Sequence, residues 1–210
     1  MSANSRILRY VASERVNHWL TAITFILLAF SGLALFHPAA FGLTQLFGGP
    51  VWTRILHPFL GLLLFLSFAS LALRLWRHNL LTADDLAWLL RLKRVLQNQE
   101  EGLPKVGRYN AGQKLLFWTM VLTIGFLLVT GIVIWRPWFA DYFPIEIIRF
   151  SALIHALCAA LIITGIIVHI YAAIWIRGTL GAMIHGTVSQ NWARKHHPLW
   201  FDQVHRKIKD

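Results

Sequence analysis

Two histidines lie 14 residues apart in one apolar stretch and give the clearest chemical signal in this sequence. His155 and His169 both fall within Phe150–Ile176, a run that contains no Asp, Glu, Lys or Arg. In an α-helix, 14 residues rise about 21 Å and make nearly four turns, so the two side chains lie on one face, about 40° apart. This helix therefore presents one imidazole at each of two depths, and each imidazole needs a partner on another helix.

Two more histidines lie inside apolar runs at matching depths. His57 is near the start of the second apolar run, and His18 is near the start of the first. We pair His57 with His155 as the outer pair, and His18 with His169 as the inner pair. Ionisable side chains inside a membrane span are costly and mark functional sites.

Paired histidines on facing helices are the axial ligands that a b-type haem needs. Two imidazoles on one iron leave no open site for oxygen or substrate, so we expect electron transfer. Glycines on the same faces let a porphyrin approach the backbone; they are Gly32, Gly61 and Gly165. The sequence thus predicts two haem b groups, with hydrogen bonding between helices as the alternative role of the four histidines.

The composition is that of a membrane protein. Of the 210 residues, 57% are hydrophobic and 14% are charged, against about 45–50% and about 25% in ordinary soluble domains. The charge-free runs predict four membrane helices, at about 17–36, 52–76, 114–136 and 148–176. We expect an all-α four-helix bundle in which residues 1–210 form a single membrane domain with the haems between its helices.

The basic residues predict the orientation of the chain. The net charge is +11, and 17 of the 20 Lys and Arg residues fall in the two tails and the 74–114 connection. Such an excess is typical of cytoplasmic segments, so we expect both termini in the cytoplasm, a bacterial inner membrane location and no nucleic acid partner. Cleavage of the first helix as a signal peptide is a weaker alternative, because its apolar run is longer than usual.

The 74–114 connection carries a helical pattern of its own. Thr82 and Asp85 have the spacing of a capping box, and leucines then recur at near-helical intervals. We expect an amphipathic helix at the cytoplasmic surface, in contact with membrane lipids. The C-terminal tail from Gly178 shows no strong pattern.

The remaining histidines and the single cysteine give weaker signals. His37 and His78 lie at the ends of membrane helices, where a histidine costs little, and we expect structural roles for them. Four more lie in the polar tail: His185, His196, His197 and His205. The one cysteine, Cys158, cannot form an iron–sulfur site or a cysteine zinc site, which leaves histidine as the main metal ligand.

Distinctive motifs follow one another over about residues 15–200. They are ERVNHWLTA, RILHPFLG with LSFAS, GRYNAGQKLLFW, TGIVIWRP, VHIYAAIWIRGT and ARKHHPLW, and GRYNAGQK is the most specific. In this order they resemble the cytochrome b (gamma) subunits of membrane-bound respiratory formate dehydrogenases. The resemblance implies that the outer pair holds a periplasmic haem and the inner pair a cytoplasmic haem.

The resemblance also implies a quinone site. The family places a quinone beside the cytoplasmic haem, and Asn110, Gly112 and Gln113 match the residues that bind it. An amide donor at Asn110 and an unobstructed backbone N–H at Gly112 suit a quinone oxygen. Without the resemblance, residues 110–112 are a turn before a helix.

The function implied by the resemblance is that of a membrane anchor and quinone-reducing subunit. Formate is then oxidised on a molybdenum or tungsten catalytic (alpha) subunit, and electrons reach the haems through a periplasmic iron–sulfur (beta) subunit. Candidate contacts with that subunit are Arg136, Trp138 and Arg149. This chain has no cysteine cluster, so we expect formate oxidation to occur on another subunit.

Three other functions fit parts of the pattern. The nearest is a di-haem cytochrome b that serves a hydrogenase or another periplasmic oxidoreductase. A haem-free anchor or small transporter could use the same histidines to carry protons. A free-standing quinol oxidoreductase that produces or consumes superoxide is the third.

Overall fold

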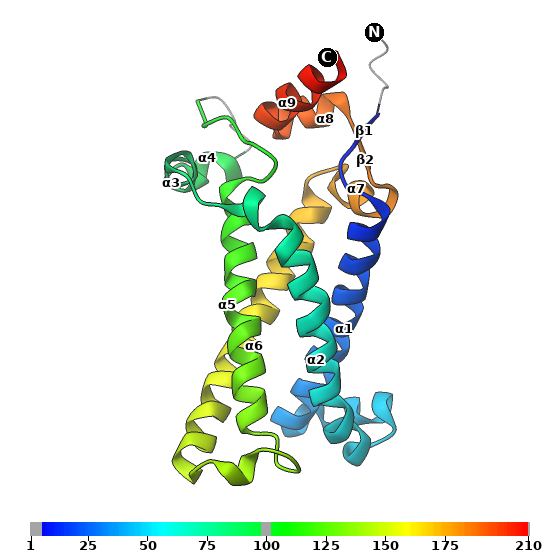
Figure 1. Ribbon diagram of the computed structural model, residues 1–210, viewed down its shortest axis with the longest axis vertical. Coiled ribbons are helices and arrows are strands. Elements are labelled where there is room, and N and C mark those ends of the chain that lie inside the picture. The colour runs from blue at the N-terminus through cyan, green and yellow to red at the C-terminus, as the bar shows by residue number, and fades with distance from the viewer. Residues whose placement is uncertain (1–5, 98–101, 210) are drawn as a thin grey trace. The chain divides into compact units, whose positions relative to one another are not determined.

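Four long helices make up half of the chain (Figure 1). The computed structural model describes residues 6–97 and 102–209. The long helices are α1 (Ala12–Phe36), α2 (Pro50–Leu75), α5 (Ala111–Val133) and α6 (Ile145–Trp175). All four are long and apolar enough to cross a membrane. The predicted all-α membrane bundle is confirmed, and the chain is a multi-pass membrane protein.

Each long helix begins a few residues before its predicted start. In α1, Glu14 lies in the first turn, and its carboxylate accepts a hydrogen bond from the backbone N–H of Val11 at 3.0 Å. The difference arises because a charge-free run marks the part of a helix that suits the bilayer. The helix itself starts at its cap, where polar side chains satisfy free backbone N–H groups.

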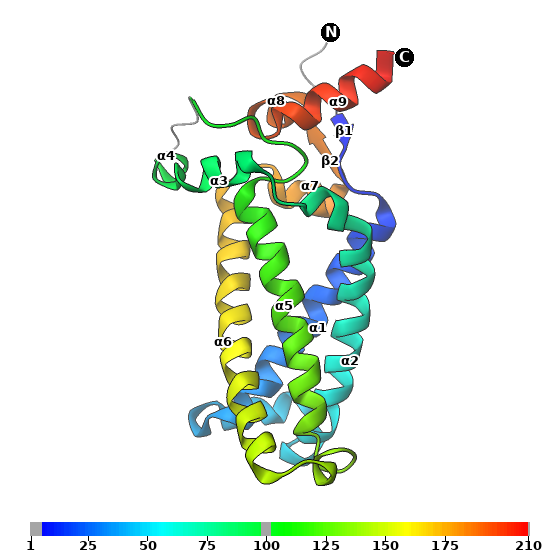
Figure 2. The same cartoon turned by 60° about the vertical axis from the view of Figure 1, so that its left-hand side comes forward.

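Most of each long helix, together with the α1–α2 and α5–α6 connections, forms one compact unit, residues 16–73 and 119–169. Within it, α1 and α2 form one antiparallel hairpin, and α5 and α6 form another (Figure 2). A buried apolar cluster joins all four helices and includes Phe25, Phe68, Ile124 and Ile162. Many other large apolar side chains on these helices are exposed, as expected of a surface that faces lipid.

Short 3-10 segments connect the helices within each hairpin. The α1–α2 connection contains η1 (Pro38–Phe47), and its N-cap is His37, whose Nδ1 accepts a backbone hydrogen bond at 3.2 Å. The connection ends at Gly48 and Gly49, whose φ angles of 86° and 98° lie in the region that favours glycine. The α5–α6 connection contains η3 (Ala140–Tyr142).

The second compact unit is formed by the described parts of residues 1–15, 74–118 and 170–210. Its only sheet among the described residues pairs β1 (Arg6–Leu8) with β2 (Thr187–Ser189) in antiparallel register. The tail helices are α7 (Thr179–His185), α8 (Gln190–His196) and α9 (Pro198–Lys209). The tail is therefore folded, although its sequence shows no strong pattern. Strands of three residues with partners at opposite ends of the chain leave no local periodicity to detect.

The connection between α2 and α5 contains three short helical segments: η2 (Trp76–Asn79), α3 (Ala83–Leu89) and α4 (Leu92–Leu96). The predicted capping box is present, because the Asp85 carboxylate accepts a hydrogen bond from the backbone N–H of Thr82 at 2.7 Å. The predicted amphipathic helix is broken in two near Leu90. Leu86 and Leu90 are 62% and 80% exposed, one turn apart, which is typical of a helix at a membrane surface.

A buried ion pair ties α3 to the first turn of α5. The Asp85 carboxylate accepts hydrogen bonds from the Lys114 ammonium at 2.7 Å and from the Thr82 hydroxyl at 2.9 Å. Burial by itself raises the pKa of Asp85, but the hydrogen bonds from Lys114 and Thr82 bring that pKa below its usual value. The carboxylate therefore stays charged and holds α3 beside the start of α5.

A buried arginine joins the N-terminal strand to the tail. Arg9 is 4% exposed, and its guanidinium lies 4.3 Å from the centre of the Trp200 ring. It donates hydrogen bonds to the backbone carbonyl of Arg108 and, at 3.5 Å, to Nε2 of His197. Nδ1 of His197 donates to the carbonyl of Gly107 at 2.8 Å. These contacts require a neutral His197. A proton on Nε2 would remove the acceptor for Arg9 and would bring a second positive charge against the guanidinium.

The tail is therefore expected to loosen in acid. Burial, together with the charge of Arg9, lowers the pKa of His197 from 6.5 to about 3. The unfolded tail takes up a proton below pH 6.5 while the folded tail does not, so stability is full above pH 6.5 and falls between pH 6.5 and about 3. At pH 5 the loss reaches about 2 kcal/mol. Limited proteolysis of the solubilised protein at pH 7.5 and pH 5 measures this loss of stability as faster cleavage of the C-terminal tail at pH 5.

The variant His197→Gln is the matched control for this measurement. Its neutral amide does not titrate, so its cleavage rate should change much less between the two pH values. Equal acid sensitivity in the variant and the wild type would contradict the role of His197.

Candidate functional site

The outer pair meets across two helices. His57 lies near the start of α2 and His155 in the first half of α6, and their ring centres are 6.4 Å apart. A metal–nitrogen bond of about 2 Å on each side, with about 1 Å from each bonding nitrogen to its ring centre, gives about 6 Å. The separation of the two rings therefore fits one metal ion bound between them.

The inner pair shows the same separation farther along α6, with α1 as the partner helix. His18 of α1 and His169 of α6 have ring centres 6.4 Å apart, with their planes at 48°. Nδ1 of His18 is buried and has no hydrogen-bond partner among the described residues. The separation of these two rings also fits one metal ion bound between them.

The apolar cluster lies between the two pairs. Ile162 is seven residues from His155 and seven from His169, which places it about two turns from each. Phe25 of α1 is seven residues after His18 and packs against the same cluster. The two pairs are thus separate sites at two depths of one bundle, with apolar packing between them.

Each outer histidine contacts a hydroxyl residue and a glycine on the neighbouring helix. Nδ1 of His57 lies 2.7 Å from Oγ of Ser31, and a Cβ on Gly32 would lie 3.3 Å from Cε1 of the ring. This close approach of Gly32 to the His57 ring agrees with the prediction that Gly32 lies beside the outer pair. Sequence reasoning missed Ser31, because a serine in an apolar helix is also common for packing alone.

The same arrangement recurs at the second outer histidine. Nδ1 of His155 lies 2.9 Å from Oγ1 of Thr130, and a Cβ on Gly131 would lie 3.4 Å from Cε1 of the ring. Both residues open the TGIVIWRP motif, but the sequence alone assigned them no role at the histidine site. The available signal was the repeat of a hydroxyl residue followed by glycine, in the helix that precedes each outer histidine. Gly61 borders open space among the described residues.

The three predicted quinone residues lie at the start of α5. The backbone N–H of Gln113 donates to Oδ1 of Asn110, and the backbone N–H of Asn110 donates to Oε1 of Gln113, each at 2.9 Å. This reciprocal pair caps the helix. Both side-chain oxygens are used, so the amides present their NH₂ groups as donors. A Cβ on Gly112 would lie 3.7 Å from the ring of Trp88 on α3, so the ring is close to the glycine.

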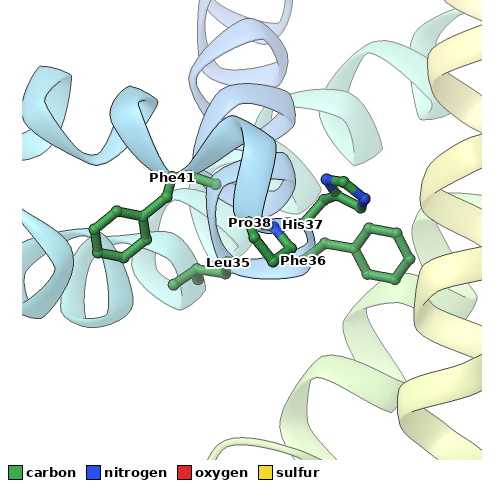
Figure 3. Close-up of a pocket in the computed structure, with 6 residues that line it drawn as sticks. Leu35, Phe36, His37, Pro38 and Phe41 are labelled. Carbon is green, nitrogen blue, oxygen red and sulfur yellow. The ribbon is translucent and has the colours of Figure 1, made fainter.

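The remaining histidines lie outside these pairs. His37 caps η1, exposed His78 lies in η2, and His197 contacts Arg9. An open pocket of about 490 Å³ surrounds the outer end of α1, with Phe41 and Leu35 on one side in Figure 3 and the rings of Phe36 and His37 on the other. None of the seven predicted site residues lines it. Among the described residues, no group of three or more His, Cys, Asp or Glu side chains is placed to hold a metal ion.

Curated relatives resemble the chain over nearly its full length. It is 46% identical to the formate dehydrogenase cytochrome b556 (Fdo) subunit of Escherichia coli K12, over 98% of this chain and 97% of the relative. It is 43% identical to the nitrate-inducible cytochrome b556 (Fdn) subunit of the same organism, over 98% and 95%. Identity to the formate dehydrogenase cytochrome b556 subunit of Haemophilus influenzae is 40%, over 100% and 89%.

These relatives confirm the resemblance that the motifs indicated. The model of one protein family, described as prokaryotic cytochrome b561, matches residues 9–186. This range includes both histidine pairs and the start of α5. A cytochrome b family implies a haem b cofactor, which agrees with the separation of the paired rings. The chain therefore belongs to the prokaryotic cytochrome b561 family.

Proposed function

We propose that this chain is the di-haem cytochrome b subunit of a formate dehydrogenase complex. It anchors the complex in the bacterial inner membrane and carries electrons from a periplasmic iron–sulfur subunit to a quinone near the cytoplasmic face. The observation that carries the proposal is the recurrence of one histidine geometry, 6.4 Å between ring centres, at two depths of the bundle. The names of the curated relatives support the choice of complex.

The four histidines are the proposed axial ligands. His57 and His155 hold the iron of the periplasmic haem, and His18 and His169 hold the iron of the cytoplasmic haem. Haem b supplies a one-electron iron couple when bound. The protein's part would be to fix both imidazoles and to surround the site with apolar side chains that exclude water. Residues 1–210 form a single cytochrome b domain in this proposal.

The other subunits supply the chemistry that this chain lacks. With one cysteine in 210 residues, the chain has no ligand set for an iron–sulfur cluster. Formate oxidation is therefore assigned to a molybdenum or tungsten catalytic subunit, and electron delivery to an iron–sulfur subunit. The 17 basic residues in the tails and the 74–114 connection support a cytoplasmic location for both termini.

Quinone reduction is assigned to the start of α5. The amide NH₂ groups of Asn110 and Gln113 and the backbone N–H of Gly112 are donors to the quinone oxygens. The N–H of Gly112 belongs to the first turn of the helix, where backbone donors lack helical partners. The resemblance to the formate dehydrogenase subunits supports this role for the three residues. The quinone, menaquinone or ubiquinone, is a substrate that takes up protons from the cytoplasmic side.

Purification of the complex in mild detergent tests the proposal as a whole. We expect a formate-oxidising molybdenum or tungsten subunit to copurify with this chain, and formate to reduce its haem absorption bands. A quinone-site inhibitor should slow haem reoxidation. A nickel–iron partner would instead identify the complex as a hydrogenase, and a colourless protein would identify a haem-free anchor or transporter.

Loss of one histidine should remove one haem. In His57→Ala and His155→Ala, we expect about half of the haem absorbance, because one iron–nitrogen bond no longer holds the outer haem. His18→Ala and His169→Ala should remove the other half. Pyridine haemochrome spectra of the purified variants measure the haem content per chain. His185→Ala is the control, since His185 is exposed at the end of α7. Full haem content in both outer variants would refute the ligand assignment.

Two near-isosteric variants separate the quinone role from the capping role. Asn110→Asp and Gln113→Glu keep the side-chain oxygens that cap α5 but remove the NH₂ donors. Because each lost hydrogen bond is worth about 0.5–1.5 kcal/mol, we expect the KM for quinone to rise about three- to tenfold. Steady-state reduction of a soluble quinone analogue measures this effect. The haem content should stay at the wild-type level, and an unchanged KM in both variants would exclude these amides as quinone donors.

A further inference from the structure

Two hydroxyl–glycine pairs flank the outer histidines in the same way. Ser31 and Gly32 on α1 contact His57, and Thr130 and Gly131 on α5 contact His155. We propose that Ser31 and Thr130 are positioning residues that fix the tautomer and the orientation of the outer histidines and lower the reduction potential of the haem they hold. This inference rests on the proposed function of His57 and His155 as ligands.

The hydroxyl protons determine the direction of these hydrogen bonds. Oγ1 of Thr130 donates to the backbone carbonyl of Phe126 at 2.6 Å, and Oγ of Ser31 donates to the carbonyl of Leu28 at 3.2 Å. A hydroxyl has one proton to donate, so towards the histidine it accepts. Nδ1 of each imidazole therefore carries the proton.

The tautomer leaves the other ring nitrogen free to bind iron. A neutral imidazole with its proton on Nδ1 has its lone pair on Nε2. The glycines complete the arrangement, because a Cβ at Gly32 or Gly131 would lie 3.3 or 3.4 Å from Cε1, tighter than most such contacts. The hydroxyl lies at Nδ1, and the glycine backbone lies beside Cε1. Together they fix the plane of each ring.

The two histidine pairs differ in the hydrogen bonding of Nδ1. Nδ1 of His18, in the inner pair, has no hydrogen-bond partner among the described residues. An imidazole whose N–H is hydrogen-bonded is a more basic ligand and stabilises the ferric state. The hydroxyls at Ser31 and Thr130 therefore lower the potential of the outer haem relative to the inner haem. A potential difference in this direction favours electron transfer from the outer haem to the inner haem.

Redox titration of the complex with both haems bound tests the inference. In Thr130→Val and Ser31→Ala, we expect the ferrous-to-ferric ratio of the outer haem at a fixed potential to rise about three- to tenfold, as expected for one lost hydrogen bond. A tenfold change corresponds to about 59 mV for one electron. The inner haem should titrate as in the wild type. Low-spin ferric EPR signals should shift for the outer haem only, because the ring planes are no longer fixed.

Matched variants separate this role from general packing. Thr123 lies two turns before Thr130 on α5, is buried, and donates a hydrogen bond to the backbone carbonyl of Thr119 at 2.7 Å. Within the described part of the chain, its hydroxyl bonds to backbone carbonyls and not to a histidine. Thr123→Val should leave both potentials unchanged. Thr130→Ser keeps the hydroxyl and should restore the wild-type potential and EPR signal, even where Thr130→Val loses the haem.

Failure of the positioning role and failure of the ligand assignment give different results. Wild-type potentials and EPR signals in both Thr130→Val and Ser31→Ala would overturn the inference, and so would equal changes in Thr123→Val. If His57→Ala and His155→Ala also retain the outer haem, the ligand assignment itself is wrong. If they lose it while the hydroxyl variants behave as the wild type, only the positioning role is wrong.

Discussion

The structure depends on how imidazoles are satisfied inside the hydrocarbon of a membrane. Water is not available there, so each ring nitrogen must find a partner in the protein or on a ligand. The outer histidines meet half of this requirement with the hydroxyls of Ser31 and Thr130. At both depths the separation of the facing rings would let a metal ion satisfy one more nitrogen of each histidine.

The helices and the histidine pairs could be predicted because both depend on spacing along one chain. Charge-free runs show which segments suit a bilayer, and the interval between His155 and His169 specifies two depths on one face. The pairing partners follow once the helices are known to alternate in direction. The capping box at Thr82 was also visible, because its two residues are three positions apart.

The features that could not be predicted join residues distant in sequence. Thr130 and His155 are 25 residues apart, and their contact depends on the register between α5 and α6, which hydropathy does not specify. The β1–β2 sheet and the contact of Arg9 with His197 join opposite ends of the chain. The capping role of Asn110 and Gln113 is local, but it was not predicted. The usual capping box begins with Ser or Thr, and here Asn takes that position.

The apolar cluster around Phe25, Phe68, Ile124 and Ile162 has a consequence for protons. Its members among the described residues are hydrocarbon and thioether side chains, and none of them can gain or lose a proton at any physiological pH. Electrons can tunnel through such a layer, whereas protons need a chain of titratable groups or water. The cluster itself therefore offers protons no route between the two histidine pairs, although electrons can cross it.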